Sequence, residues 1–235
     1  MSATITRRPP VNAVIPPLEQ GDHLTRDEFE RRYNAMPHVK KAELIEGEVH
    51  MPSPVRLRRH GVPHTNLSTW LGNYKVSTPG TEAADNATVR LDLENEPQPD
   101  AMMVILPECG GRTTITDDDY IEGGPELAAE IAASSVSIDL HTKLRVYRRN
   151  GVREYIVWRV DDATIDWFVL RGSDYERLQP DAAGILKSEV FPGLWLDPVA
   201  MTRFDLATVL QVLQQGLADA DHAAFVRRLQ EKVGR

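Results

Sequence analysis

The sequence predicts a mixed α/β domain in which helices flank a central sheet, with the element order helix, strand, strand, strand, helix, strand. The continuous apolar run at residues 101–106 and the mainly apolar run at residues 127–132 have the length and composition of buried strands. Leu140, Leu144 and Tyr147 recur at helical spacing after the second run. This stripe predicts a helix between the second run and the next strand.

The chain of 235 residues suits one domain with small additions. Residues 1–22 are rich in proline and lack apolar periodicity, which predicts a flexible N-terminal arm. We expect the main domain at residues 23–198. Residues 199–235 are expected to form a helical C-terminal extension.

The first helix is expected to begin at Thr25 and to stop before Pro37, because Thr25 and Glu28 have the spacing of a capping box. A hairpin is expected next, at residues 42–51. It turns at Gly47, since glycine tolerates the positive φ that a tight turn requires.

The remaining elements follow from apolar period and from glycine and proline punctuation. Residues 108–124 are polar and are expected to form a loop. Residues 204–219 are apolar enough to need a partner surface, either the core or a second subunit. The predicted strands lie at 87–93, 101–106, 127–132, 155–160, 165–170 and 175–178, and the predicted helices at 64–74, 138–149, 204–219 and 222–233.

The composition is acidic, with 35 Asp and Glu against 27 Lys and Arg. This balance argues against binding that depends mainly on phosphate contacts, so a nucleic-acid substrate requires a local basic face. The single Cys109 excludes an internal disulfide and lacks partners at zinc spacing, so a reducing cytoplasm is expected. No apolar run approaches the roughly 20 residues of a membrane span, and residues 1–10 lack the apolar core of a signal peptide.

Two acidic residues belong to the predicted inner strands. Asp100 opens the strand at 101–106, and Glu130 interrupts the apolar run at 127–132, where carboxylates are uncommon unless paired or metal-bound. Mg²⁺ is usually held by one or two carboxylates plus a substrate phosphate, so the two side chains suffice for one ion. Lys143 can reach that place to orient water if its helix packs beside Glu130. This is the inventory of a metal-dependent phosphodiester hydrolase.

Structural explanations stand beside these functional ones. Asp100 can be a turn residue that starts a strand. Lys143 can pair with Asp139 on a solvated helix face, which is worth about 0.3–0.5 kcal/mol. Glu43 can be the ordinary polar residue of a hairpin, or it can add or orient a ligand. His64 can be a surface residue or local cap, or it can contact phosphate.

A short basic run offers a local exception to the acidic composition. It suits contact with phosphate, although an arginine-rich loop is usually only solvated. Its members are Arg56, Arg58, Arg59 and His60.

Taken together, these motifs resemble the Uma-type putative restriction endonuclease family of the PD-(D/E)XK nuclease superfamily. The resemblance covers about residues 25–197. The matching motifs are Glu43 to Val49, His64 at a helix start, Gln98-Pro99-Asp100, Glu130 with Ser134, Asp139 with Lys143, Tyr147, Gly151-Val152 and Glu154 to Val157.

The resemblance implies a restriction-endonuclease-like core, αβββαβ, extended here by a β-meander and C-terminal helices. It implies that Asp100 and Glu130 bind the metal, and that Glu43 and His64 lie at the edge of the site. The superfamily places its lysine two residues after the glutamate, where this chain has Ala132. In this family the lysine comes from the following helix, which makes Lys143 the replacement.

A second departure from the family pattern follows the glutamate. The family commonly has a Ser-Pro pair there, whereas residues 133–135 of this chain are Ala-Ser-Ser. The difference concerns the geometry of this loop more than the chemistry of the site.

The sequence therefore predicts an endonuclease that hydrolyses DNA phosphodiester bonds with Mg²⁺ or Mn²⁺. Asp100 and Glu130 hold the metal and Lys143 positions the attacking water. The alternative is a catalytically inactive relative that keeps the fold as a binding or interaction module, with its partner surface on the C-terminal helices. A homodimer is one expectation, because cleavage of a duplex needs two cuts.

Overall fold

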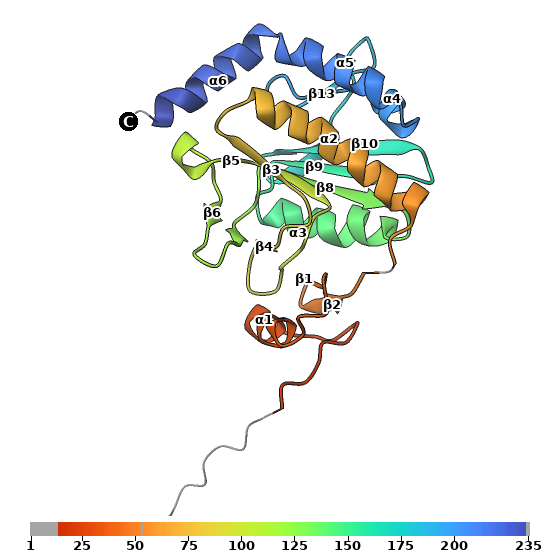
Figure 1. The fold of residues 1–235 in the computed structure, drawn as a ribbon, viewed down its shortest axis with the longest axis vertical. Helices are drawn as coiled ribbons and strands as arrows, with labels where there is room; N and C mark the ends of the chain where they lie inside the picture. Colours follow the sequence, from red (N-terminus) through yellow and green to blue (C-terminus); the bar gives the residue numbers. More distant parts are fainter. Residues whose placement is uncertain (1–13, 53, 234–235) are drawn as a thin grey trace, which may run out of the picture.

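The computed structural model describes residues 14–52 and 54–233. Its centre is a six-stranded sheet of order β11-β10-β9-β8-β5-β3, in which β8 and β9 are parallel and the other neighbours antiparallel. The strands are β3 (Thr81–Ala84), β5 (Ala101–Ile105), β8 (Leu127–Ala132), β9 (Glu154–Arg159), β10 (Thr164–Arg171) and β11 (Asp174–Arg177). A mixed sheet between helices confirms the predicted fold class (Figure 1).

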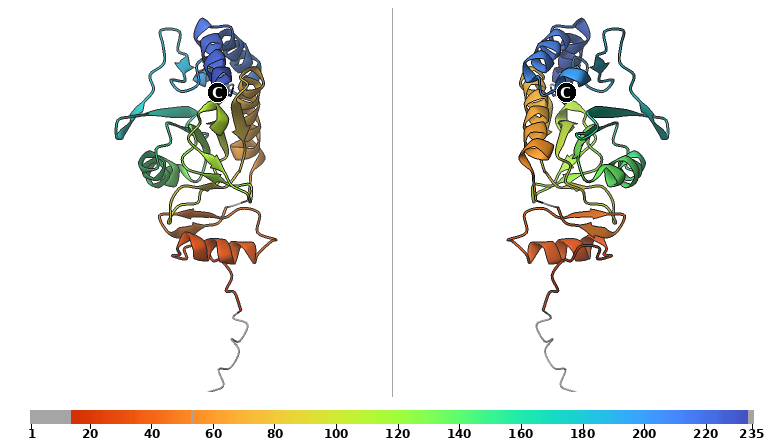
Figure 2. Two further views of the ribbon diagram at one scale, coloured as in Figure 1. Left: turned by 90° about the vertical axis from the view of Figure 1, so that its left-hand side faces the viewer. Right: turned by 90° about the vertical axis from the view of Figure 1, so that its right-hand side faces the viewer.

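Helices cover both faces of this sheet (Figures 1 and 2). The turn η3 is π-helical and runs directly into α3, so the two lie on one face as one continuous helical segment. The elements of that face are η3 (Ile138–Lys143) and α3 (Leu144–Arg149). The other face carries α2 (Val62–Ser77), α4 (Pro198–Thr202), α5 (Leu206–Leu217) and α6 (Ala220–Val233).

Alternate residues of β8 face the two sides of the sheet, as strand geometry requires. Ala129 and Ile131 belong to the larger hydrophobic cluster, which includes residues of α2, α5 and α6. Ala128 and Ala132 belong to the smaller cluster beside α3. Glu130 points to the same side as Ala128 and Ala132 and therefore faces the η3–α3 segment.

The N-terminal helix α1 (Arg26–Asn34) packs on the predicted hairpin, which is formed by β1 (Glu43–Ile45) and β2 (Glu48–His50). The turn between these strands has positive φ at Gly47, as expected. Phe29 and Leu44 are fully buried in the cluster that joins helix and hairpin. Leu18 joins them, although most of the expected arm at residues 1–22 lies outside the described residues.

Short elements complete the fold. A three-stranded sheet has the order β4-β7-β6, and β12 pairs with β13. The turn η1 is π-helical and leads into α2, whereas η2 is a 3₁₀ turn. These elements are β4 (Val89–Arg90), β6 (Thr114–Ile115), β7 (Ile121–Glu122), β12 (Leu186–Lys187), β13 (Trp195–Leu196), η1 (Leu57–Gly61) and η2 (Pro107–Cys109).

Three predictions for local structure were wrong. Residues 87–93 form only the short strand β4 outside the main sheet, whose edge is instead β3, a strand without the apolar alternation that marks strands in sequence. Thr25 is the N-cap of α1, but its side chain makes no cap hydrogen bond, and the carboxylate of Glu28 pairs with two arginines of its own helix instead of completing a capping box. Residues 108–124 are not only loop, since they contain η2, β6 and β7.

The C-terminal helices pack on the core. Val209 and Leu213 of α5 are fully buried in the larger cluster, and Phe225 and Leu229 of α6 join them there. The apolar face predicted at residues 204–219 is thus covered within the chain, and the homodimer stays a prediction. None of the helices in the described part of the chain is long and apolar enough to cross a membrane.

Candidate active site

Asp100 and Glu130 lie on neighbouring antiparallel strands. Asp100 directly precedes β5, and the pairing of Ala101 with Ala129 places Asp100 opposite Glu130 when the register is continued by one residue. Both side chains are buried, with 4% and 3% of the residue exposed. The backbone N–H of Ile131 donates to Oδ2 of Asp100 at 2.9 Å, which fixes that carboxylate against β8.

Lys143 reaches this place from the η3–α3 segment. Its Nζ donates to Oε1 of Glu130 and to Oε1 of Glu43, each at 2.9 Å, and lies 3.9 Å from Oδ1 of Asp139. The hydroxyl of Tyr147, one helical turn further on, donates to the same oxygen of Glu130 at 2.9 Å. Lys143 and Asp139 are both buried, so the solvated ion pair considered for them does not occur.

Asp100 has its own partners, an ammonium group and an imidazole ring. Nζ of Lys41 lies 3.2 Å from Oδ1, and Nε2 of His60 lies 3.2 Å from Oδ2. Sequence reasoning had assigned His60 only to a basic run and had missed Lys41. A signal for Lys41 exists in the sequence, because it lies two residues before Glu43 and alternation puts both side chains on one side of an extended segment.

The site holds more carboxyl groups than ammonium groups. Glu43, Asp100, Glu130 and Asp139 stand against the ammonium groups of Lys41 and Lys143, so full ionisation leaves an excess of negative charge. Burial raises the pKa of Glu130 to about 8; Lys143 opposes this rise, and the neighbouring carboxylates reinforce it.

Asp100 and Lys143, which lie near Glu130 in space, are charged at neutral pH. Burial acts to raise the pKa of Asp100, but the hydrogen bond from His60 and the charge of Lys41 outweigh it and hold that pKa well below its usual range. Burial acts to lower the pKa of Lys143, but Glu130 and Glu43 outweigh it and raise that pKa. Lys143 is therefore an ammonium donor.

His64 and the basic run lie at the edge of this arrangement. Nε2 of His64 donates to the backbone oxygen of Asp100 at 2.8 Å and lies 3.7 Å from Oδ2 of Asp85, so it braces the strand start and touches neither predicted metal ligand's carboxylate. Arg59 pairs with Asp161. The other two arginines of the run, Arg56 and Arg58, are exposed.

The donor set suits a hard cation. Within residues 14–52 and 54–233, no three His, Cys, Asp or Glu side chains lie close enough together to hold a metal ion. Magnesium requires only one or two protein carboxylates, because water and substrate oxygens complete its coordination. The two acidic residues at opposite positions of neighbouring strands, Asp100 and Glu130, meet that requirement in number and in chemistry.

The fold is similar to that of a putative nuclease from Anabaena variabilis, known from a crystal structure. The two share 14% identity and superpose with a TM-score of 0.53, over 73% of this chain and 97% of that chain. No curated protein matches the chain. Residues 26–200 match the Uma2 family, described as putative restriction endonuclease, and the resemblance noted in the sequence is confirmed. The chain therefore belongs to the Uma2 family of putative restriction endonucleases.

Proposed function

We propose that this chain is a metal-dependent endonuclease that hydrolyses DNA phosphodiester bonds. One observation carries the proposal: two buried acidic residues, Asp100 and Glu130, lie at opposite positions of neighbouring strands, with the ammonium of Lys143 bonded to Glu130. Burying a carboxylate costs stability unless it is paired or binds a metal, and perturbed titratable groups gather at functional sites. Membership of a nuclease family supports this assignment.

Asp100 and Glu130 would hold Mg²⁺ or Mn²⁺ in this proposal. A bound divalent cation supplies polarisation of the phosphoryl oxygen and acidifies water. Asp100 is ready to bind, since its pKa is already depressed by His60 and Lys41. Glu130 must lose a proton when the cation arrives at neutral pH, because burial has raised its pKa.

Lys143 would position the attacking water and offset charge on the phosphorus. Its raised pKa makes it a donor rather than a general base. Glu43 fixes the ammonium from the second side, and it also accepts a hydrogen bond from the backbone N–H of Gln98 at 2.8 Å. Lys41, which faces Asp100, is the second cation near the path of a phosphate.

The inactive binding module remains the second candidate, and one observation favours it. Both carboxylate oxygens of Asp100 already have partners, Lys41 on one and His60 with the N–H of Ile131 on the other. A cation would have to displace at least one of these groups. A site that is satisfied by its own cations can keep this arrangement for stability alone.

A calorimetric titration of Mn²⁺ into the wild-type protein and into Glu130→Gln distinguishes the two candidates. We expect saturable binding by the wild type and its loss in the variant. Glu154→Gln is the matched control, because Glu154 is also fully buried, one strand away in β9, but bonds to Ser188 rather than to the site. The same proteins are then assayed for cleavage of single-stranded and duplex DNA with Mg²⁺ or Mn²⁺.

Cleavage by the wild type that Glu130→Gln and Asp100→Asn abolish, and that Glu154→Gln retains, would support the endonuclease. Equal cleavage by wild type and by the two site variants would show that the activity does not arise here. A folded wild type that cleaves no DNA with either metal would favour the inactive module.

A further inference from the structure

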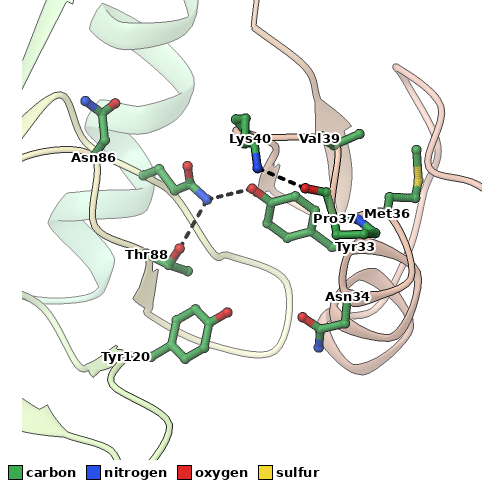
Figure 3. A pocket seen from close by; sticks show the side chains of 10 residues that line it. Tyr33, Asn34, Met36, Pro37, Val39, Lys40, Asn86, Thr88 and Tyr120 are labelled. Carbon is green, nitrogen blue, oxygen red and sulfur yellow. Dashed lines mark hydrogen bonds between the residues drawn. The ribbon is translucent and has the colours of Figure 1, made fainter.

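A pocket lies beside the candidate active site, between the end of α1 and the loops that precede β5 and β7. It encloses about 380 Å³. Figure 3 shows Thr88 and Tyr120, from the loops before β4 and β7, on one wall, and Tyr33 and Asn34 of α1 on the opposite wall. The lining thus combines two aromatic rings with hydroxyl and amide groups.

The two aromatic rings are held in place by other residues. One guanidinium, that of Arg90, lies 4.2 Å from the centre of the Tyr120 ring and bonds to Glu30 of α1 at 2.8 Å and to Asp118 at 2.9 Å. It therefore ties the two walls together. On the opposite wall, Tyr33 packs on Phe29 with the ring centres 5.5 Å apart. Both aromatic rings of the pocket are therefore held by packing contacts with neighbouring side chains.

A buried amide supplies the polar part of the pocket. Gln98 is 4% exposed, and its Nε2 donates to the hydroxyl oxygens of Tyr33 at 3.3 Å and Thr88 at 3.1 Å. These bonds use both N–H groups of the amide and leave Oε1 to accept from a ligand. A ligand that fits is planar, aromatic and polar at its edge, as a nucleobase is.

The pocket shares residues with the catalytic candidates. The backbone N–H of Gln98 donates to Glu43 at 2.8 Å, and Oδ1 of Asn86 accepts from Lys41, the cation that faces Asp100, at 3.0 Å. A base bound here would therefore belong to a nucleotide next to the phosphate at the metal ligands. Stacked, paired bases of a duplex cannot enter such a pocket.

We propose that this pocket binds an unpaired nucleobase of a DNA strand, adjacent to the phosphodiester that is cleaved. The inference rests on the proposed nuclease function and makes single-stranded DNA, or duplex DNA with one base extruded, the preferred substrate. It would also give an acidic chain, which carries 35 Asp and Glu against 27 Lys and Arg, a way to bind DNA. Stacking supplies affinity that does not depend on phosphate contacts.

Fluorescence anisotropy with a labelled single-stranded DNA tests the pocket without cleavage when metal is chelated. The comparison strand has the same length and an abasic sugar at every position. We expect Tyr120→Leu to weaken binding of the ordinary strand by about 5- to 150-fold, the equivalent of about 1–3 kcal/mol for one stacked base. Binding of the abasic strand should stay unchanged, and Tyr120→Phe, which restores the ring, should recover the lost affinity.

Trp195→Leu is the matched control, since Trp195 is a half-buried aromatic with Lys187 3.9 Å above its ring but lies outside the pocket, on β13. Thermal melting verifies that each variant is folded. Equal losses for both strands, or no loss for either, would overturn the base pocket even if Mn²⁺-dependent cleavage persists. A wild type that neither binds nor cleaves any DNA would overturn the nuclease function and the pocket together.

Discussion

Replacing Lys143 with Met tests the charge balance of the site directly. The substitution keeps an unbranched side chain that is one atom shorter and removes its charge. In the wild type, Nζ bonds to Glu43 and Glu130 at 2.9 Å each and lies 3.9 Å from Asp139. The variant leaves these three carboxylates without their common cation.

The expected loss follows from burial, because Lys143 is only 4% exposed. Removing one partner of a buried ion pair costs about 3–5 kcal/mol, since the remaining charge is buried without compensation. For a domain of this size each 1 kcal/mol lowers the melting temperature by about 2–4 °C, so we expect a fall of about 6–20 °C. The loss should be smaller at pH 5, where Glu130 is neutral because burial raises its pKa to about 8.

Thermal and urea unfolding at pH 8 and pH 5, with metal chelated, measure this effect. Lys75→Met is the control, because Lys75 is a half-buried lysine of α2 that pairs with Glu82 on the surface, and we expect a change within about 0.5 kcal/mol. Adding Glu130→Gln to Lys143→Met should restore part of the stability. A Lys143→Met protein as stable as the wild type at pH 8 would refute the charge balance proposed here.

Three further predictions concern the fold. Burial raises the pKa of Glu154 from 4.5 to about 7, so its contribution to stability is complete below pH 4.5 and is lost as pH rises through 7; unfolding curves of Glu154→Gln should lack this part of the decline. Leu213→Ala should cost about 2–5 kcal/mol in urea unfolding, and a cost below about 1 kcal/mol would mean that α5 is not part of the core. Gly111→Ala should lower the free energy of unfolding by about 3 kcal/mol or more, because the new Cβ would lie 1.7 Å from the backbone oxygen of Ile105. In the same assay its control, Gly72→Ala, should stabilise α2 by about 0.5–1 kcal/mol, because the new Cβ would meet nothing within 4 Å.

The central strands and the helix beside Glu130 were predictable from sequence. Apolar runs identified β5 and β8, and a charge inside the second run marked Glu130 as unusual in the sequence alone. Edge elements were harder, because β3 and β4 are short and bury little apolar surface. Their sequences therefore carry almost no periodic signal.

Some residues of the candidate site were likewise predictable from the sequence, and others were not. The sequence alone assigned Asp100, Glu130 and Lys143 to successive core elements. It could do so because hydrophobic period and its interruption by polar residues are local properties of a sequence. Only the tertiary structure brought Lys41 and His60 to Asp100 and buried the pair of Lys143 and Asp139. It also closed the pocket between Tyr33 and Tyr120, which lie far apart in the chain. Such contacts depend on strand register and helix packing, which are set by long-range burial and not by neighbouring residues.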